Sequence, residues 1–146
     1  MHALPLESGV IYGPVRSRRL GISLGINVLP LRRKVCSFDC VYCHYGPTVV
    51  PTLSPDESEF PGVPEIVAAV ERALRRTPHV DSLTFSGNGE PTLHPYFRDV
   101  VLGVRRLRDR LNPQARISLF SNATMAHLPQ IREALAHLDA PIMKLD

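Results

Sequence analysis

The sequence has no tryptophan, and phenylalanine and tyrosine are also scarce, so that aromatic residues make up only 6% of its 146 residues. No run approaches the roughly 18 apolar residues of a membrane-spanning helix, and the first residues show no basic stretch followed by an apolar one. We therefore expect no membrane span and a cytoplasmic location. Cysteine occurs at only three positions, and an odd, clustered set argues against a disulfide framework. In a reducing compartment such a cluster typically binds metal.

The composition is ordinary for a globular protein, with 44% hydrophobic and 21% charged residues and a net charge of +3. The length predicts a single domain spanning residues 1–146. Six basic residues precede the first cysteine: Arg16, Arg18, Arg19, Arg32, Arg33 and Lys34. This basic segment is compatible with a solvated surface or with contacts to an anionic substrate.

Alternating hydrophobic patterns predict an α/β fold. Strands are expected over 21–29, 80–86, 116–120 and 141–145, and helices over 64–76, 95–111 and from Pro129 onward. Each expected helix begins near a proline, which suits the first helical position. Residues 1–20 are rich in glycine, proline and arginine and are interpreted as an extension packed over the core. This order of elements predicts about four parallel strands joined by crossover helices.

Polar or glycine residues follow every predicted strand. The cysteine loop follows the first strand, and Ser86-Gly87-Asn88-Gly89-Glu90 ends the second. Ser121-Asn122-Ala123-Thr124 ends the third, and Lys144-Leu145-Asp146 ends the fourth. The carboxyl ends of parallel strands lie at one edge of a sheet, where ligands of such folds bind. These four segments are therefore expected to converge on one pocket.

The cysteines, Cys36-Ser-Phe-Asp-Cys40-Val-Tyr-Cys43, allow three interpretations. Cys40-Val-Tyr-Cys43-His44 matches the covalent haem pattern, but it leaves Cys36 unexplained. Structural zinc bound by the three cysteines and His44 would require adjacent residues to share one ion, whereas such sites tend to use two separated ligand pairs. A [4Fe–4S] cluster with three thiolate ligands would leave one iron open.

The third interpretation agrees with a resemblance. The spacing Cys-x-x-x-Cys-x-x-Cys, with Tyr42 before the last cysteine, resembles the signature of the radical SAM superfamily. Gly87-Asn88-Gly89-Glu90-Pro91 is similar to that family's glycine–glutamate motif. Within the superfamily, Gly25-Ile-Asn-Val-Leu-Pro30 and the cysteine segment look most like Fe–S oxidoreductases classed with wyosine-type tRNA-modifying synthetases.

The resemblance implies a partial (β/α) TIM-type barrel and an enzyme that cleaves S-adenosylmethionine (SAM) reductively at a [4Fe–4S] cluster. An external electron donor would be a partner, with a tRNA or another anionic molecule as the substrate. The cysteines would bind iron and Tyr42 would lie near the adenine. The ammonium of SAM would be received by the segment 87–90, through the Glu90 carboxylate or backbone carbonyls. Its carboxylate and ribose would be contacted by Ser121, Asn122, Thr124, Lys144 and Asp146, and His44 would line the substrate side.

The family core has about six β/α units, whereas this sequence predicts four strands. The last strand would then be an exposed sheet edge, which a second chain could cover. A truncated, non-catalytic metal-binding domain is the alternative function.

Overall fold

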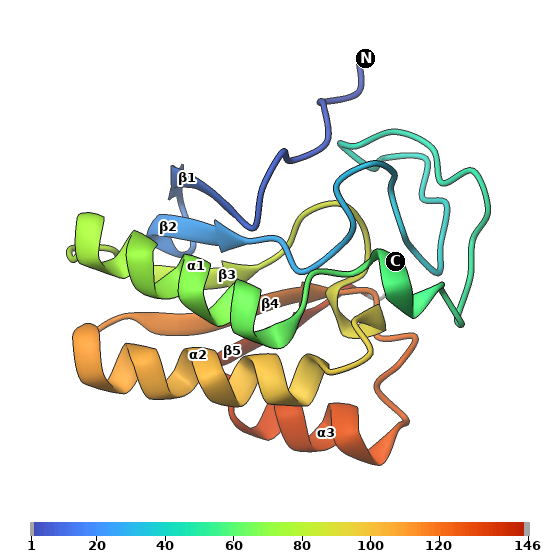
Figure 1. The fold of residues 1–146 in the computed structure, drawn as a ribbon. Coiled ribbons are helices and arrows are strands. Elements are labelled where there is room, and N and C mark those ends of the chain that lie inside the picture. The colour runs from blue at the N-terminus through green and yellow to red at the C-terminus, as the bar shows by residue number, and fades with distance from the viewer. Residues whose placement is uncertain (1, 145–146) are drawn as a thin grey trace.

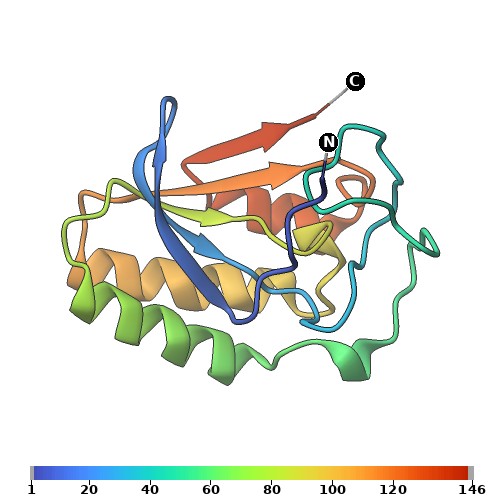
Figure 2. The ribbon, with the colours of Figure 1, turned by 90° about the horizontal axis from the view of Figure 1, so that it is seen from above.

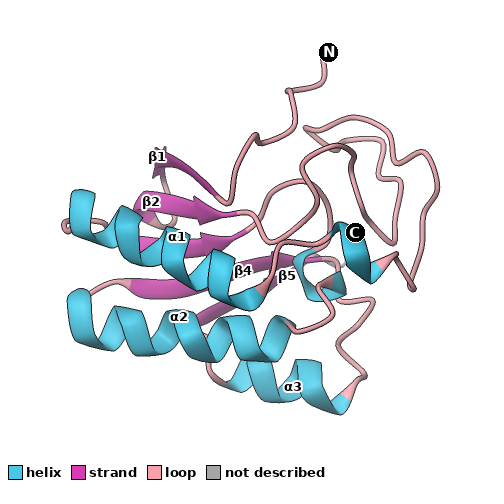
Figure 3. Cartoon of the chain, in the orientation of Figure 1, coloured by secondary structure: helices cyan, strands magenta, loops and turns pink. Residues whose placement is uncertain are grey.

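The computed structural model describes residues 2–144, and the chain forms a five-stranded sheet with three α-helices on its outer face (Figures 1 and 2). The strands are β1 (Ile11–Ser17), β2 (Gly21–Ile26), β3 (Ser82–Phe85), β4 (Arg116–Ser121) and β5 (Ala140–Met143). The α-helices are α1 (Val63–Arg76), α2 (Phe97–Leu111) and α3 (Pro129–Ala136). Two short 3-10 helices, η1 (Glu57–Glu59) and η2 (Pro91–Leu93), lie within the connecting loops (Figure 3).

The strands lie in chain order, and β2 to β5 are all parallel. The predicted α/β class and the four parallel strands with three crossover helices are therefore confirmed. The boundaries shift by a few residues: the first parallel strand ends at Ile26 rather than at residue 29, and η2 precedes the second helix. The last strand ends at Met143, and Leu145 and Asp146 lie outside the described residues.

The N-terminal segment differs from the expectation, because β1 pairs antiparallel with β2 and forms an edge of the sheet. Gly13 and Pro14 interrupt the hydrophobic pattern of this segment, and the pairing register shifts between Tyr12 and Val15. Proline cannot donate to a strand ladder but is tolerated in edge strands and at bulges. A strand that contains such an interruption lacks the alternating hydrophobic pattern by which strands are recognised. The sequence therefore indicates only an extension for residues 1–20.

The core lies between the sheet and the helices. Strand residues Leu24, Leu83 and Ile117 are neighbours in register, and all are at most 2% exposed. Their helical partners include Ile66, Val70, Val100, Val104 and Ile131, which repeat at helical spacing.

The opposite face of the sheet is polar. Because side chains alternate along a strand, the hydroxyl residues beside these leucines point away from the helices. Ser23 bonds Thr84 at 2.7 Å, and Ser82 bonds Ser118 at 3.0 Å. All four are buried, so the hydroxyl groups satisfy one another across neighbouring strands.

Candidate cofactor site

The cysteine loop follows β2 at the carboxyl end of the parallel strands (Figure 1). The three thiols are free and half-buried. A turn brings the second and third together, since the Cys43 amide donates to the Cys40 carbonyl at 3.1 Å. Asp39 accepts from the Thr48 amide at 2.8 Å and fixes the far side of the loop. The loop is thus held by its own backbone and by neighbouring segments.

A short parallel bridge joins the start of this loop to the glycine segment after β3. The Val35 amide donates to the Asn88 carbonyl at 2.9 Å, and the Glu90 amide donates to the Val35 carbonyl at 3.0 Å. Gly89 lies directly against Val35 with φ at +139°, a region that side chains rarely adopt. The glycine motif therefore permits close approach of two backbones and sets the position of the first cysteine.

We expect Gly89→Ala to destabilise the protein by about 2 kcal/mol or more, because the new Cβ would overlap the Val35 carbonyl at an unfavourable φ. Urea unfolding measures the change. Gly9→Ala is the matched control: its Cβ would meet nothing closer than 4.0 Å, so stability should stay within about 0.5 kcal/mol. Equal losses in both variants would contradict the close-approach role of Gly89.

Glu90 is 2% exposed, and its carboxylate connects the loops that follow β3 and β4. One oxygen accepts from the Asn122 amide at 2.7 Å. The other accepts from the Ser121 hydroxyl at 2.8 Å and from the amide and hydroxyl of Thr92. A role for this carboxylate in receiving the SAM ammonium stays a prediction. In this structure it holds both loops, and the backbone carbonyls of the glycine segment remain the alternative acceptors.

A pocket of about 300 Å³ lies where these segments meet. Its lining includes most of the predicted residues: Cys36, Cys40, Cys43, Tyr42, His44, Gly87, Gly89, Glu90, Ser121, Asn122 and Lys144. Ser86, which begins the segment expected after the second strand, also lines it, and three further lining residues are not indicated by the sequence: Phe38, Tyr45 and Phe120. The convergence expected from the parallel topology is therefore present. Phe120 lies near the carboxyl end of β4, and its position at a strand end is the sequence signal that could have identified it.

Two predicted residues, Thr124 and Asn88, are placed differently. Thr124 is not among the lining residues, and its hydroxyl bonds that of Ser37 at 2.7 Å. Asp146 lies outside the described residues. Asn88 is fully buried and faces away from the pocket: its Oδ1 accepts from the Glu7 amide at 2.7 Å, and its Nδ2 donates to the Glu7 and Pro30 carbonyls. Asn88 therefore secures the N-terminal segment.

Residues 4–10 form a strap between the cysteine loop and the glycine segment. The Leu4 amide donates to the His44 carbonyl at 2.7 Å, and the Tyr45 hydroxyl donates to the Glu7 carboxylate at 2.8 Å. Burial, followed by the hydrogen bond to Glu7, raises the pKa of Tyr45 well above its usual range. Tyr45 therefore stays protonated, and its hydroxyl holds the Glu7 carboxylate of the strap.

We expect Asn88→Ala to cost about 2 kcal/mol of stability and to release this strap, because the Glu7 amide loses its buried acceptor. Hydrogen exchange should show loss of protection at the Glu7 amide before the strands exchange. Gln114→Ala, at an exposed position, should leave the exchange pattern unchanged. Retained protection at Glu7 in the Asn88 variant would refute the role of Asn88 in holding the strap.

The protonation of the Cys36 thiol depends on its surroundings. Burial raises the pKa of Cys36, and the Asn122 side-chain amide lies 3.7 Å from its sulfur. A metal-bound thiol loses its proton outright, so a bound iron would override this effect of burial. At the pocket mouth, the Lys144 ammonium lies 5.6 Å from the centre of the Tyr42 ring, within the range of a cation–π contact.

Among residues 2–144, no three histidine, cysteine, aspartate or glutamate side chains are gathered around a position for one metal ion. The four ligands of the zinc interpretation, the three cysteines and His44, are thus not arranged as a single-ion site. A [4Fe–4S] cube spreads its thiolates over three different irons, so this finding does not bear on a cube. Three free thiols at a pocket wall, with soft sulfur donors and an amide beside one sulfur, fit such a cluster.

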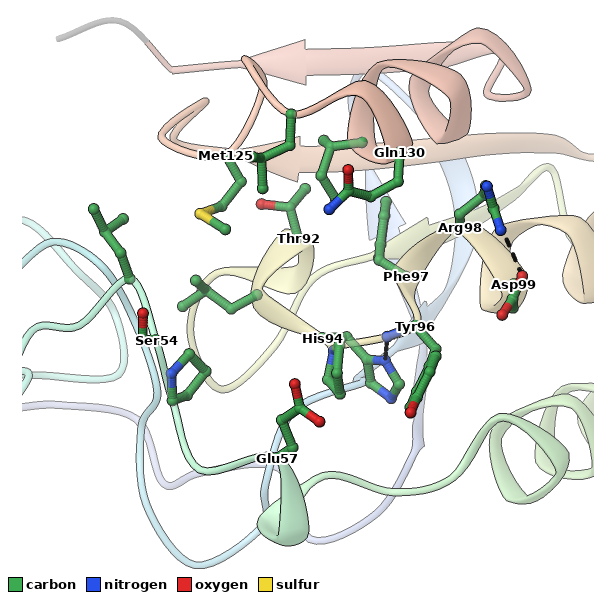
Figure 4. A pocket seen from close by; sticks show the side chains of 16 residues that line it. Ser54, Glu57, Thr92, His94, Tyr96, Phe97, Arg98, Asp99, Met125 and Gln130 are labelled. Atoms are coloured by element: carbon green, nitrogen blue, oxygen red, sulfur yellow. Dashed lines mark hydrogen bonds and ion pairs between the residues drawn. The ribbon is translucent and has the colours of Figure 1, made fainter.

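A second cavity, of about 360 Å³, lies between the loop that carries η1 and the first turns of α2 and α3 (Figure 4). His94 lines it, but both ring nitrogens are engaged, with the Pro61 carbonyl at 2.8 Å and the Tyr96 amide at 3.0 Å. Burial lowers the pKa of His94, so its ring is neutral near pH 7. Thr92 also lines this cavity, while its hydroxyl bonds Glu90. The cavity contains no cysteine, and its histidine is committed to structure.

No helix among the described residues is long and apolar enough to cross a membrane. No solved structure matches the chain. A UPF0026 protein of Methanocaldococcus jannaschii is 37% identical over 141 residues, which cover 94% of this chain and 40% of that protein. A UPF0026 protein of Synechocystis is 37% identical over 93% of this chain and 48% of its own length. A Brachyspira hyodysenteriae protein named GTPase Obg is 31% identical over 97% of this chain and 19% of its own length.

The chain thus spans less than half the length of these relatives. The family model of the radical SAM superfamily matches residues 33–145, which begin just before the cysteine loop and include all the strands after β2. Members of this superfamily in general bind SAM and an iron–sulfur cluster and use an electron donor. The match covers most of the chain and both motifs at the pocket, and we conclude that the chain belongs to the radical SAM superfamily.

Proposed function

We propose that this chain carries the cluster and SAM site of a radical SAM enzyme, with Cys36, Cys40 and Cys43 as ligands of a [4Fe–4S] cluster. The observation that carries the proposal is the shared pocket, which brings the three thiols together with the ends of β3, β4 and β5. When bound and reduced, such a cluster supplies the electron that cleaves SAM to methionine and a 5′-deoxyadenosyl radical, which abstracts a substrate hydrogen.

The residues of this chain would bind and orient the cofactors. Tyr42 would supply an aromatic face for the adenine, and Gly87 and Gly89, which line the pocket, would offer backbone carbonyls to the ammonium. Ser121, Asn122 and Lys144 supply a hydroxyl, an amide and an ammonium for the carboxylate and ribose. Because the Ser121 hydroxyl already donates to Glu90, it is available there chiefly as an acceptor.

The substrate class follows only from the resemblance and the basic N-terminal segment, which together suggest a tRNA or another anionic molecule. The β5 edge of the sheet remains a candidate surface for further strands or for a second chain. Both points are predictions that rest on the proposed function.

Anaerobic reconstitution followed by addition of dithionite and SAM tests the activity. We expect 5′-deoxyadenosine and methionine in equal amounts, measured by chromatography, and none in a Cys36→Ala/Cys40→Ala/Cys43→Ala variant. A cluster-loaded chain that binds SAM but forms no 5′-deoxyadenosine above background would overturn the proposal of catalysis. It would favour the alternative, a non-catalytic metal-binding domain.

A further inference from the structure

The end of the molecule opposite the cysteines carries an exposed arginine surface. It comprises the turn between β1 and β2, the carboxyl ends of α1 and α2, and the start of β4, which lie together at the left of Figure 1. We call it the arginine face, and its members are Arg16, Arg18, Arg19, Arg72, Arg75, Arg76, Arg106, Arg110 and Arg116. All nine are exposed.

Contacts connect the elements within two parts of this face: one set joins the hairpin turn to β3 and β4, and another joins α1 to α2. The Arg116 side chain donates to the Arg19 carbonyl at 3.5 Å and so connects β4 to the hairpin turn. Asp81 joins the same region, since its carboxylate accepts from the Ile22 amide at 2.8 Å and its carbonyl accepts from the Arg116 amide. On the helices, Glu71 of α1 binds Arg110 of α2 at 3.4 Å.

The positive charge of this face is not balanced. Of the 17 basic and 14 acidic residues of the chain, nine exposed arginines and four carboxylates, Glu71, Asp81, Asp109 and Asp139, lie at this end, so the remaining part of the chain is net acidic. Glu71 pairs with Arg75 and Arg110, and Asp109 pairs with the buried Arg108. Among the described residues, the other seven arginines have no carboxylate within ion-pair distance.

Helix dipoles account for only part of this pattern. Cations stabilise the carboxyl ends of helices, which explains Arg75 and Arg76 in α1 and Arg110 in α2. The helix dipole does not explain the arginines of the hairpin turn or Arg116, because these residues lie on strands and turns. Unpaired like charges repel one another, so a bound anion would stabilise this face.

The composition favours one class of anion. Every cation of the face is an arginine, whereas both lysines of the chain, Lys34 and Lys144, lie at the cysteine end. The planar guanidinium matches a phosphate group with two parallel hydrogen bonds. No aromatic residue belongs to the face, and its exposed large apolar side chains are limited to Val15 and Ile22 of the hairpin, whereas most of the others lie in the loops around the cysteines. A protein partner or a membrane would require apolar anchors.

We propose that the arginine face binds the phosphate backbone of a nucleic acid, at the end of the molecule remote from the cluster pocket. The site would position the partner by its backbone without reading bases, since the face offers charge and no stacking platform. Arg16, Arg18 and Arg19 also belong to the basic segment behind the proposed substrate class, but this binding does not require the cluster, SAM or catalysis, so its failure and that of the proposed catalysis are distinguishable.

The test is fluorescence anisotropy of the unreconstituted chain with a labelled RNA duplex of about 20 base pairs, long enough to span such a face. We expect binding that weakens steeply between about 50 and 200 mM salt. Arg16→Gln/Arg18→Gln/Arg19→Gln should lower affinity about tenfold and reduce the salt slope by about one per lost phosphate contact. Arg72→Gln/Arg76→Gln/Arg106→Gln, on the helices, provides a second test that does not alter the hairpin.

The control is Arg98→Gln/Arg132→Gln, which removes positive charge at the start of α2 and in α3, outside the arginine face and the basic N-terminal segment, and should leave the slope unchanged. Absence of binding at low salt, or an equal loss in this control, would overturn the proposal. Competition by poly-glutamate as effective as unlabelled RNA, at equal charge concentration, would also overturn it in favour of an acidic protein partner. Circular dichroism confirms that each variant is folded.

Discussion

Replacing Cys36, Cys40 and Cys43 together with alanine is expected to abolish iron and sulfide uptake. The unaltered chain, reconstituted anaerobically, should bind about four irons and four sulfides, because three thiolates are enough to hold a [4Fe–4S] cube and leave one iron open. The protein should then show the brown colour of such a cluster. Iron and sulfide analysis, with the absorption spectrum, measures the change. All three positions are free thiols at one pocket, so each single variant should also lose most of the cluster.

The control for this prediction is His44→Ala, which alters the residue next to Cys43 that also lines the pocket. A three-cysteine cluster predicts undiminished iron in this variant. One equivalent of zinc that depends on His44 would instead support the four-ligand zinc site. Undiminished iron in the triple cysteine variant would refute the cluster altogether.

Glu90→Ala is expected to cost about 3 kcal/mol of stability, because it leaves the half-buried Asn122 amide and the buried Thr92 amide without an acceptor and removes a bond to Ser121. The loops after β3 and β4 would then no longer be fixed at the pocket, so SAM binding should also be lost. Urea unfolding and equilibrium dialysis with labelled SAM measure the two effects.

Glu65→Gln provides the matched control, since Glu65 is an exposed carboxylate in the first turn of α1. Its stability should change by no more than about 0.5 kcal/mol, with SAM binding intact. If Glu90→Gln bound SAM normally and kept full stability, the carboxylate would have no part in holding the loops. If Glu90→Gln kept stability but lost SAM binding, direct contact with the ligand would be the better account.

The sequence alone predicted the α/β class, the helices and the four parallel strands, because buried strands and amphipathic helices have distinct hydrophobic periods. It missed β1, since Gly13 and Pro14 interrupt the pattern and the strand depends on pairing with β2. It also predicted that the ends of distant strands would meet, which follows from topology and holds for the lining residues Cys36, Glu90 and Ser121.

The sequence by itself was therefore enough to identify the cysteine motif and the glycine motif as parts of the candidate site, because both are local patterns of residue type and spacing. The orientation of each side chain within the motif was decided only by the tertiary structure. Asn88 and Glu90 are two residues apart, yet Asn88 holds the N-terminal strap, while Glu90 faces the β4 loop. The reason is that hydrogen-bond partners from distant segments select the orientation, and Glu7 and Asn122 are brought there only by folding.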